Sequence, residues 1–494
     1  MRSRDSPATN YQEENKMKMF INGREADASD GGVFEVINSA THEYIDTVPK
    51  ATAQDVEEAI EAAQEGKKVW AATPVHERAR ILTLAADRID ERREELAHSL
   101  SEEMGKIIRE ARGEIRVCAQ ILRGFAQAAC SHYGHTMTDY QIGAEKDVIF
   151  TRYEPLGVIA CISPFNYPVE LCTQKFAPAL ATGNAVIIKP ASDNPLTVMK
   201  IVKILLESGV PGNVLQLVTG SGGSIGDLLS SSEKIQAITL TGSTEVGVHV
   251  LETAAPTLKK TFFELGGNDP FIVFDDADLS LAIKEAAAGR VQNAGQTCCS
   301  PKRFLVQNTV KKAFIEGVLE YYKNIKRGNP VDDDTEFGSL INARAAKTVD
   351  EQVKLTVSQG AKLVCGGYIY NETWYEPTLL DDVTPNMDIA RDMECFGPVM
   401  PVIGFDTEEE AVRIANNTIY GLQAGVMTKD MRKAIRVAEK LECGGVVING
   451  SGNYRDLDQP FGGNKKSGIG REGVSVTLNE YTQEKSYIMK GILA

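Results

Sequence analysis

Two adjacent cysteines, Cys298 and Cys299, lie in the stretch NAGQTCCSPKRFLV, just before an apolar run that predicts a buried strand from Phe304. Cysteines beside a core strand are usually small, buried and unreactive side chains. These two instead follow glycine and polar residues that are typical of a turn, where a thiol can meet a substrate. The alternatives are therefore a structural thiol and a nucleophile, and a nucleophile needs a neighbouring group to activate it.

Three polar residues follow apolar runs elsewhere, and each has an ordinary and a chemical interpretation. Glu264, before Gly266 and Gly267, is either a solvated carboxylate at a strand end or a general base for water. Asn166, in SPFNYP, is either a turn asparagine or a rigid amide that donates to an oxyanion. Lys189, in IIKPAS, is either a surface charge or a ligand of ribose and phosphate oxygens.

Two glycine-containing turns complete the candidates. In LTGSTEVG an apolar run ends at Gly242 and a helix is predicted to open at Ser243, where free backbone N–H groups favour an anion. A second turn, TGSGGSIG, covers residues 219–226 and includes Gly222. Its glycine spacing does not match the GxGxxG fingerprint, so a standard dinucleotide-binding motif is not supported.

From about residue 157 onward, apolar runs alternate with helical stretches. GVIACISP and NAVIIKPA end in turn residues, and PLTVMKIVKILLESG has the period of a helix. A second alternating set extends from PFIVFDDAD to GGVVING. This alternation predicts parallel sheets covered by helices, so the expected fold class is α/β.

The two ends of the chain have other patterns. Short apolar runs around an Asn-Gly pair predict an early hairpin, and residues 52–106 have helical periodicity, with Thr52 and Asp55 able to cap the start. Most charges of this helical block are expected on a solvated face. Residues 136–157 predict another hairpin, and residues 478–494 predict one more strand.

The whole-chain properties narrow the class of protein. A length of 494 residues suggests about three domains, and a net charge of −15 repels phosphate backbones, so nucleic acid is not an expected partner. No apolar run reaches the roughly 20 residues of a membrane helix, and residues 1–16 lack the apolar core of a signal peptide. We expect a disordered tail at 1–16, no membrane partner and a cytoplasmic protein.

Cysteine and histidine usage argues against disulfides and metals. The nine cysteines are an odd number without a CxxC pair, which is typical of reduced thiols. The six histidines do not cluster with other ligands at metal-binding spacing. No metal site is therefore expected.

Taken together, the candidate residues resemble the aldehyde dehydrogenase superfamily in order and spacing. Cys298 lies in GQTC, 34 residues after Glu264 in ELGGN, and this separation matches the family. Three further stretches resemble family motifs: ECFGPV from Glu394, YGLQAGV from Tyr420 and PFGGNKKSGIGREG from Pro460. The resemblance covers essentially everything after the tail. It implies an enzyme that oxidises an aldehyde to the carboxylic acid with NAD or NADP.

The resemblance also implies a role for each candidate. Cys298 takes the nucleophile position and passes through a thiohemiacetal and a thioester, with Cys299 as a neighbour that lines the pocket. Asn166 and the Cys298 backbone N–H form the oxyanion hole, and Glu264 is the base for the water that hydrolyses the thioester. The positions implied to bind the coenzyme are Phe165, Lys189, Pro190, Ala191, Ser192, Gly222, Gly242, Ser243, Leu265, Glu394 and Phe396.

Position 192 bears on the choice of coenzyme. NAD-preferring relatives often have glutamate there, and its carboxylate would repel the 2′-phosphate of NADP. Ser192 removes this repulsion, while Lys189 adds positive charge nearby. We therefore expect NADP to be accepted and favoured over NAD.

By the same resemblance, the architecture has three parts and a tail. A Rossmann-like cofactor domain and a catalytic domain each hold a parallel sheet, and a small β element joins subunits into a homodimer or homotetramer. The implied boundaries are 1–16 for the tail, 17–138 and 157–266 for the cofactor-binding domain, 267–465 for the catalytic domain, and 139–156 with 480–494 for the oligomerisation segments.

The substrate is expected to be a short aliphatic aldehyde or semialdehyde. SPFNYPVELCTQK resembles the lactaldehyde and non-phosphorylating glyceraldehyde-phosphate branches, and KPAS resembles a succinate-semialdehyde branch. That last branch commonly has arginine where this chain has Gln174, so Arg455 is the other candidate cation, with a surface-loop arginine as the alternative. Phe165 and Ser339 also depart from the family pattern, which usually has tryptophan and proline there.

Two other functions are less favoured. A CoA-acylating semialdehyde dehydrogenase would use a thiol in place of water, but that branch typically lacks the glutamate found here as Glu264. A non-enzymatic protein on the same fold need not keep nucleophile, base and oxyanion donor together, and this chain keeps all three.

Overall fold

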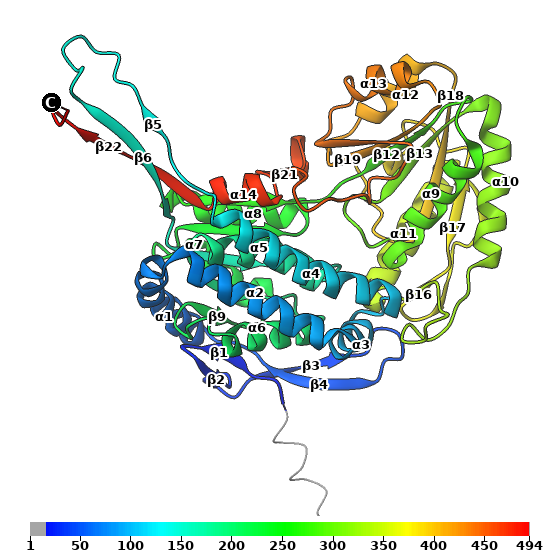
Figure 1. Cartoon of the computed structure of the whole chain (residues 1–494). Helices are drawn as coiled ribbons and strands as arrows, with labels where there is room; N and C mark the ends of the chain where they lie inside the picture. Colours follow the sequence, from blue (N-terminus) through cyan, green and yellow to red (C-terminus); the bar gives the residue numbers. More distant parts are fainter. Residues whose placement is uncertain (1–15, 494) are drawn as a thin grey trace, which may run out of the picture.

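The computed structural model describes residues 16–493, so the tail expected at 1–16 lies outside the described residues except for its last position. Within this range the chain forms two large sheets flanked by helices and a slender three-stranded arm (Figure 1). The expected α/β class, with two sheet-containing parts and a small β element, is confirmed.

The first large sheet has eight strands in the order β2-β1-β9-β8-β7-β10-β11-β21. Its centre, from β9 to β11, is parallel, whereas the pairings that add β1, β2 and β21 at the edges are antiparallel. β1 and β2 form the predicted early hairpin, which turns at Asn22 and Gly23, both with positive φ. The strands are β1 (Met19–Ile21), β2 (Arg24–Ala26), β7 (Val158–Ile162), β8 (Ala185–Lys189), β9 (Leu215–Leu217), β10 (Ala237–Thr241), β11 (Lys260–Glu264) and β21 (Gly468–Ile469).

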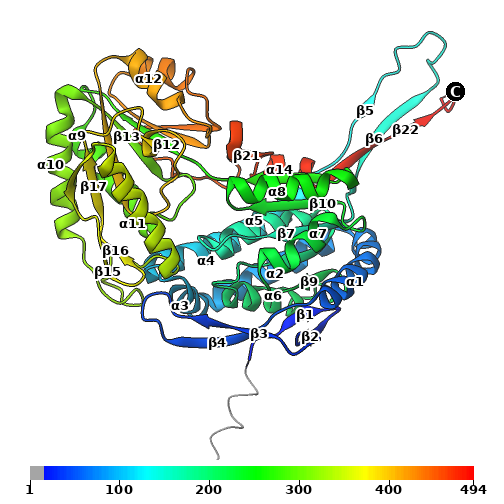
Figure 2. The ribbon, with the colours of Figure 1, turned by 180° about the vertical axis from the view of Figure 1, so that it is seen from behind.

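Helices cover both faces of this sheet (Figures 1 and 2). Ile159 and Cys161 of β7 pack with α2, α4, α5 and α6, whereas Val158 and Ala160 pack on the other face with α1 and α8. Burial on both faces explains the continuous apolar runs of the central strands. The helices are α1 (Ala53–Ala72), which begins with the predicted Thr52–Asp55 capping box, α2 (Val75–Glu91), α3 (Arg93–Met104), α4 (Ile108–Ala129), α5 (Pro168–Ala181), α6 (Leu196–Glu207), α7 (Asp227–Ser231) and α8 (Thr244–Ala254).

The second large sheet has the order β14-β17-β18-β13-β12-β19-β20, and every pairing except β14–β17 is parallel. The strand predicted from Phe304 begins earlier, at Pro301. Its elements are β12 (Asp269–Val273), β13 (Pro301–Gln307), β14 (Lys362–Cys365), β17 (Thr378–Asp381), β18 (Val399–Phe405), β19 (Gln423–Met427), β20 (Gly445–Ile448), α9 (Leu279–Val291), α10 (Asn308–Asn324), α11 (Ala343–Ser358), α12 (Glu408–Asn416) and α13 (Met431–Ala438).

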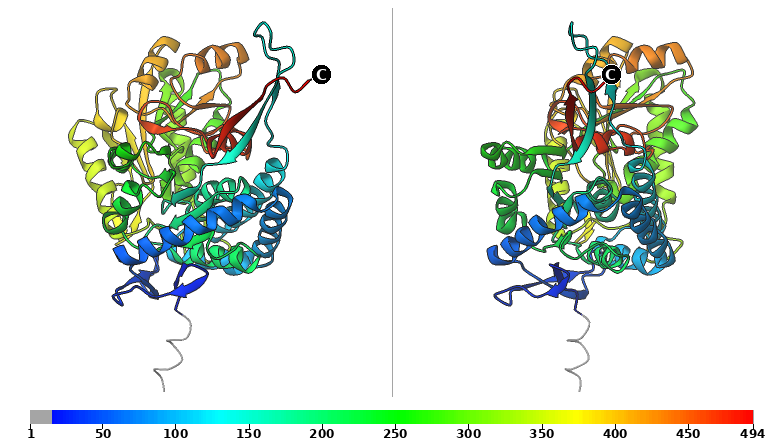
Figure 3. Two further views of the ribbon diagram at one scale, coloured as in Figure 1. Left: turned by 90° about the vertical axis from the view of Figure 1, so that its left-hand side faces the viewer. Right: turned by 60° about the vertical axis from the view of Figure 1, so that its left-hand side comes forward.

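The arm joins β22 (Thr482–Met489) to β6 (Val148–Pro155) along their full length, and β5 (Thr136–Met137) pairs with the other edge of β6. The predicted hairpin at 136–157 is confirmed, but the strand predicted over 478–494 begins later because α14 (Val474–Glu480) takes its first residues. The arm extends away from the body (Figures 1 and 3).

Two shorter features complete the description. Two-stranded ribbons are formed by β3 (Val33–Ile37) with β4 (Tyr44–Pro49) and by β15 (Ile369–Asn371) with β16 (Trp374–Tyr375). Between residues 16 and 493, none of the helices has the length and apolarity that crossing a membrane requires.

Candidate active site

Four candidate residues meet at one edge of the eight-stranded sheet. Lys189 ends β8 and Glu264 ends β11, while Asn166 and Gly242 lie in the segments that follow β7 and β10. These strands are neighbours in the order β8-β7-β10-β11 and run parallel, so their carboxyl ends share one edge. The crevice at the carboxyl ends of parallel strands is where open α/β sheets bind nucleotides.

The turn that carries the cysteines begins with three left-handed residues. Residues 293–295, Asn-Ala-Gly, have φ of 49°, 52° and 79°, and only glycine adopts this region without strain. The chain then passes through Cys298, which is half-buried, and Cys299, which is buried, before β13 begins. Of the two thiols, Cys298 is thus the more accessible.

Cys298 and Glu264 lie close enough that each shifts the titration of the other. A contact with the Cys299 thiol, together with burial, raises the pKa of Cys298 well above its usual value, and the Lys302 ammonium acts in the opposite direction. Burial, together with charge on Cys298, raises the pKa of Glu264 well above its usual value. Both groups therefore favour their neutral forms in the free protein.

The Glu264 side chain is only 4% exposed, and neither carboxylate oxygen has a hydrogen-bond partner among the described residues. The solvated-carboxylate alternative is therefore wrong. Buried polar groups are nearly always hydrogen-bonded, so a carboxylate without a partner is available to a water or a reacting group. A Cβ added to Gly267 would come within 2.9 Å of the Cys298 carbonyl oxygen, so this glycine permits the close approach of the two segments.

Asn166 is 3% exposed, and its backbone carbonyl accepts hydrogen bonds from Lys106 Nζ and Asn293 Nδ2, each at 2.9 Å. Asn293 Nδ2 also donates to the carbonyl of Gln296 at 3.2 Å. The loop of Asn166 is thereby joined to the turn that carries Cys298.

The positions implied to bind the adenosine end of the coenzyme surround β8 and α8. Lys189 is 5% exposed and burial lowers its pKa to about 8, so the surface-charge alternative is wrong. Its ammonium donates to the Pro190 carbonyl at 3.2 Å, and Ser192 Oγ donates to the Gly220 carbonyl at 2.9 Å. Ser243 is the N-cap of α8, as predicted, so the free N–H groups of this helix start face the same edge of the sheet.

The positions implied for the nicotinamide end lie beside the cysteine turn. Glu394 pairs with Lys302 Nζ at 3.3 Å, and the same ammonium donates to the Cys298 carbonyl. Phe396 packs edge-on against Phe165, with ring centroids 5.9 Å apart. A carboxylate for ribose hydroxyls, a helix start for phosphates and an aromatic pair fit a nicotinamide coenzyme. The other implied positions, Pro190, Ala191, Gly222 and Leu265, lie in the segments that follow β8, β9 and β11.

Arg455 belongs to a largely buried ion-pair cluster and is not fully exposed, as the surface-loop alternative would have it. Its side chain is 16% exposed, stacks over the Phe461 ring at 4.2 Å and pairs with Glu472 at 2.7 Å. Glu472 also pairs with the buried Lys175 at 3.0 Å. Burial alone would raise the pKa of Glu472, but Lys175 and Arg455 hold it below its usual value. Both Glu472 and Lys175 shift the pKa of Glu264, so the cluster borders the site.

Sequence reasoning missed several residues of the site, namely Lys106, Glu114, Asn293, Lys302 and Glu472. The side chains of Lys106 and Glu114 are 0% exposed, so Lys106 is an exception to the expectation that most charges of the first helical block lie on a solvated face. The only local signal is a lysine after a helix-ending glycine with a glutamate eight residues later, and this pattern also occurs on solvated helices.

The comparisons with known proteins agree with this geometry. The aldehyde dehydrogenase family model matches residues 26–487. A glutarate-semialdehyde dehydrogenase from Pseudomonas putida is 38% identical over 470 residues, covering 95% of this chain and 97% of that protein. A succinate-semialdehyde dehydrogenase (NADP+) from Escherichia coli is 37% identical over 472 residues, with 95% and 97% covered. Betaine aldehyde dehydrogenase from Staphylococcus aureus in complex with NAD+ has a TM-score of 0.94 at 33% identity, with 97% of this chain and 96% of that chain covered.

Proposed function

The chain belongs to the aldehyde dehydrogenase family, and we propose that within it Cys298, Glu264 and Asn166 oxidise a short aliphatic semialdehyde. The family and its relatives establish the reaction class, the NAD(P)-dependent oxidation of an aldehyde to a carboxylic acid. One observation carries the proposed roles. The Glu264 carboxylate is buried, has no hydrogen-bond partner among the described residues and lies next to the Cys298 thiol.

In the first half of the reaction, the Cys298 sulfur attacks the aldehyde carbon. The thiol proton passes to Glu264, directly or through water, because this carboxylate has no competing partner in the described chain. The aldehyde oxygen becomes an oxyanion, to which the Asn166 amide and the Cys298 backbone N–H donate. NAD(P)+, when bound, accepts the hydride that the carbon loses. The Lys302 ammonium donates a hydrogen bond to the Cys298 carbonyl and so keeps the turn that carries the nucleophile in place.

In the second half, water hydrolyses the thioester on Cys298. Once Glu264 has released the thiol proton to solvent, its carboxylate takes a proton from that water, and a raised pKa suits this role because a general base works best near the operating pH. The charge of Glu472 raises the pKa of this carboxylate and the charge of Lys175 lowers it. A base placed for water favours hydrolysis over transfer to the thiol of CoA.

For the coenzyme, the proposal is that NADP is preferred and NAD is still accepted. Ser192 brings no carboxylate to the ribose position, and Lys189 supplies a cation in the same loop. Asp193, the next residue, accepts a hydrogen bond from Asn342 Nδ2 at 2.9 Å, which directs its charge toward α11. The E. coli relative carries NADP+ in its name, and the S. aureus enzyme was crystallised with NAD+, so both coenzymes occur among relatives.

For the substrate, the proposal is an aldehyde with a distant carboxylate, of the succinate or glutarate semialdehyde type. Two relatives carry these substrates in their names, and of the two cations, Arg455 lies near Cys299 and Lys175 lies near Glu264. Glu472 neutralises part of this positive charge, and Gln174 stands where the succinate-semialdehyde branch commonly has arginine. We therefore expect a preference over neutral aldehydes of only about tenfold, which corresponds to about 1.4 kcal/mol, because Glu472 already pairs with both cations.

For the assembly, the proposal is a homodimer or homotetramer joined through the arm. Tyr140 is 95% exposed and Ile142 104% exposed at its tip, and Ile488 of β22 is 56% exposed, so the arm offers apolar side chains that a second chain would cover in an oligomer. Residues 139–156 and 480–494 would then be the oligomerisation segments. Residues 17–138 with 157–266 would form the coenzyme domain, and 267–465 the catalytic domain.

One experiment tests the proposed reaction. The purified protein is mixed with NADP or NAD and with succinate semialdehyde, glutarate semialdehyde, lactaldehyde or butanal, with and without CoA. Carboxylic acid and reduced coenzyme are expected in equal amounts, fastest with the two semialdehydes and NADP, and unaffected by CoA. Acyl-CoA as the product, or a preference for butanal, would contradict the proposal.

A further inference from the structure

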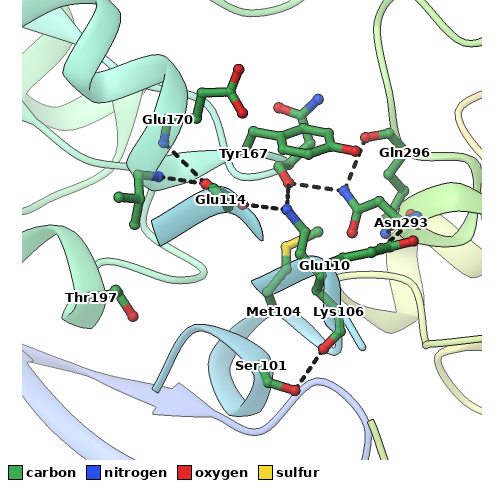
Figure 4. Close-up of polar contacts among 12 residues, drawn as sticks. Ser101, Met104, Lys106, Glu110, Glu114, Tyr167, Glu170, Thr197, Asn293 and Gln296 are labelled. Carbon is green, nitrogen blue, oxygen red and sulfur yellow. Dashed lines mark hydrogen bonds and ion pairs between the residues drawn. The ribbon is translucent and has the colours of Figure 1, made fainter. Parts of the chain in front are cut away.

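Lys106 and Glu114 form a fully buried ion pair beside the site that none of the steps above uses (Figure 4). Lys106 lies just before α4, and Glu114 lies in its second turn. A buried ion pair is weak evidence of a role in stability, because the cost of desolvating two charges offsets their attraction. The other contacts of the pair indicate what else it does.

Each partner of the pair holds one part of the Asn166 loop. Lys106 Nζ donates to the Asn166 carbonyl at 2.9 Å and lies 3.6 Å from the centre of the Tyr167 ring. Glu114 Oε1 accepts the backbone N–H groups of residues 169 and 170, at 2.9 and 3.1 Å, which are among the first of α5. The loop is therefore fixed at Asn166 itself and at the helix that follows.

The same helix also holds the turn that carries the nucleophile. Glu110, one turn before Glu114, accepts the backbone N–H of Asn293 at 3.0 Å. Asn293 Nδ2 in turn donates to the Asn166 carbonyl, the atom that Lys106 also contacts. The Asn166 carbonyl therefore connects the Asn166 loop both to the start of α4, through Lys106, and to the left-handed turn before Cys298, through Asn293.

We propose that Lys106 is a positioning residue for the oxyanion hole. Its ammonium, balanced by Glu114, fixes the Asn166 carbonyl and thereby the direction in which the Asn166 amide faces Cys298. The inference rests on the proposed roles of Asn166 and Cys298. Loss of the ammonium leaves Asn293 Nδ2 as the remaining donor to the Asn166 carbonyl, so this peptide is held less firmly. A displacement of about 1 Å in a catalytic group costs up to about 100-fold in rate.

The test measures hydride transfer in a single turnover, as reduced coenzyme formed on rapid mixing with NADP and succinate semialdehyde. Lys106→Met is expected to slow this step by about 10- to 100-fold, and to change KM for NADP by less than about twofold because Lys189 and α8 are untouched. Lys354→Met, which removes an exposed lysine paired with Asp350 on α11, is the control and is expected to keep the wild-type rate.

A second variant separates positioning from stability. Lys106→Met alone leaves the Glu114 charge buried and unpaired, which lowers the melting temperature or prevents folding. Lys106→Met combined with Glu114→Gln removes both charges and keeps an oxygen for the N–H groups of α5. This double variant is expected to regain most of the melting temperature while hydride transfer stays slow. Recovery of the rate together with the melting temperature would reduce Lys106 to a structural role and overturn the inference.

A double-mutant cycle with Asn166 completes the test. Asn166→Ala is expected to slow hydride transfer by about 100-fold or more. If Lys106 acts through Asn166, adding Lys106→Met to Asn166→Ala slows the step by less than about a further twofold. Full multiplication of the two effects would overturn the inference. An unchanged rate in Asn166→Ala alone would contradict the proposed function itself, because Asn166 would then not be the oxyanion donor.

Discussion

Replacing Glu264 by glutamine removes the proposed base and keeps the size of the side chain. The wild-type carboxylate makes no hydrogen bond to the described residues, so the substitution breaks none that holds the site together. Hydride transfer is expected to continue, because Cys298 and Asn166 remain and solvent water can take the thiol proton in place of Glu264, whereas hydrolysis of the thioester loses its general base. Such a loss typically costs about 10²- to 10⁴-fold, which corresponds to about 2.7–5.4 kcal/mol in the barrier of that step.

Rapid mixing of Glu264→Gln with NADP and succinate semialdehyde is the assay. We expect a burst of about one reduced coenzyme per active site, followed by turnover slower than in the wild type by the factor above. Glu480→Gln is a matched control, because burial raises the pKa of Glu480 to about 7 as well, but its carboxylate is bonded to the Arg471 N–H at 2.9 Å. This control is expected to behave like the wild type. A missing burst in Glu264→Gln would refute the reasoning, since it would place Glu264 chiefly in activating the thiol.

Ser192→Glu is expected to lower kcat/KM for NADP by at least about tenfold and to leave NAD equal or better, because the new carboxylate repels the 2′-phosphate; an unchanged NADP value would mean that this phosphate lies elsewhere. Arg455→Ala is expected to raise KM for succinate semialdehyde far more than for butanal, and equal effects on both would remove Arg455 from the pocket. Burial and neighbouring groups raise the pKa of both Cys298 and Glu264, and both act in their deprotonated forms, so kcat/KM is expected to rise from about pH 6 to about pH 9. A profile that falls over this range would contradict these roles.

The parallel strands could be predicted from the sequence because their patterns are local. β7, β8 and β10 are buried on both faces, so each is a continuous apolar run that ends in turn residues. The start of α1 was predictable for the same reason, since Thr52 and Asp55 form their capping box within one turn. The order of the strands, and the pairing of β22 with the distant β6, depend on contacts that no local pattern contains.

The site could be predicted only where an unusual residue type stands at a strand end or in a glycine turn. Glu264 and Lys189 were found in this way, and both are buried. Arg455 was left open between a pocket cation and a surface residue, because its polar loop is typical of a surface and only the distant Phe461 and Glu472 enclose it. Lys106 was missed because a lysine before a charged helix is usually exposed to solvent. Its contact with the Asn166 loop, which is distant in sequence, shows only in the structure.

The thioester between the acyl group and a cysteine sulfur is the intermediate whose detection tests the proposed nucleophile most directly. Glu264→Gln is mixed with NADP and succinate semialdehyde, quenched in acid and digested, and the peptide that carries both cysteines is fragmented in a mass spectrometer. We expect the added mass of a succinyl group on Cys298, because this thiol is the more accessible of the pair and lies beside Glu264. A succinyl group on Cys299, or reduced coenzyme formed without any acylated cysteine, would contradict the proposed nucleophile.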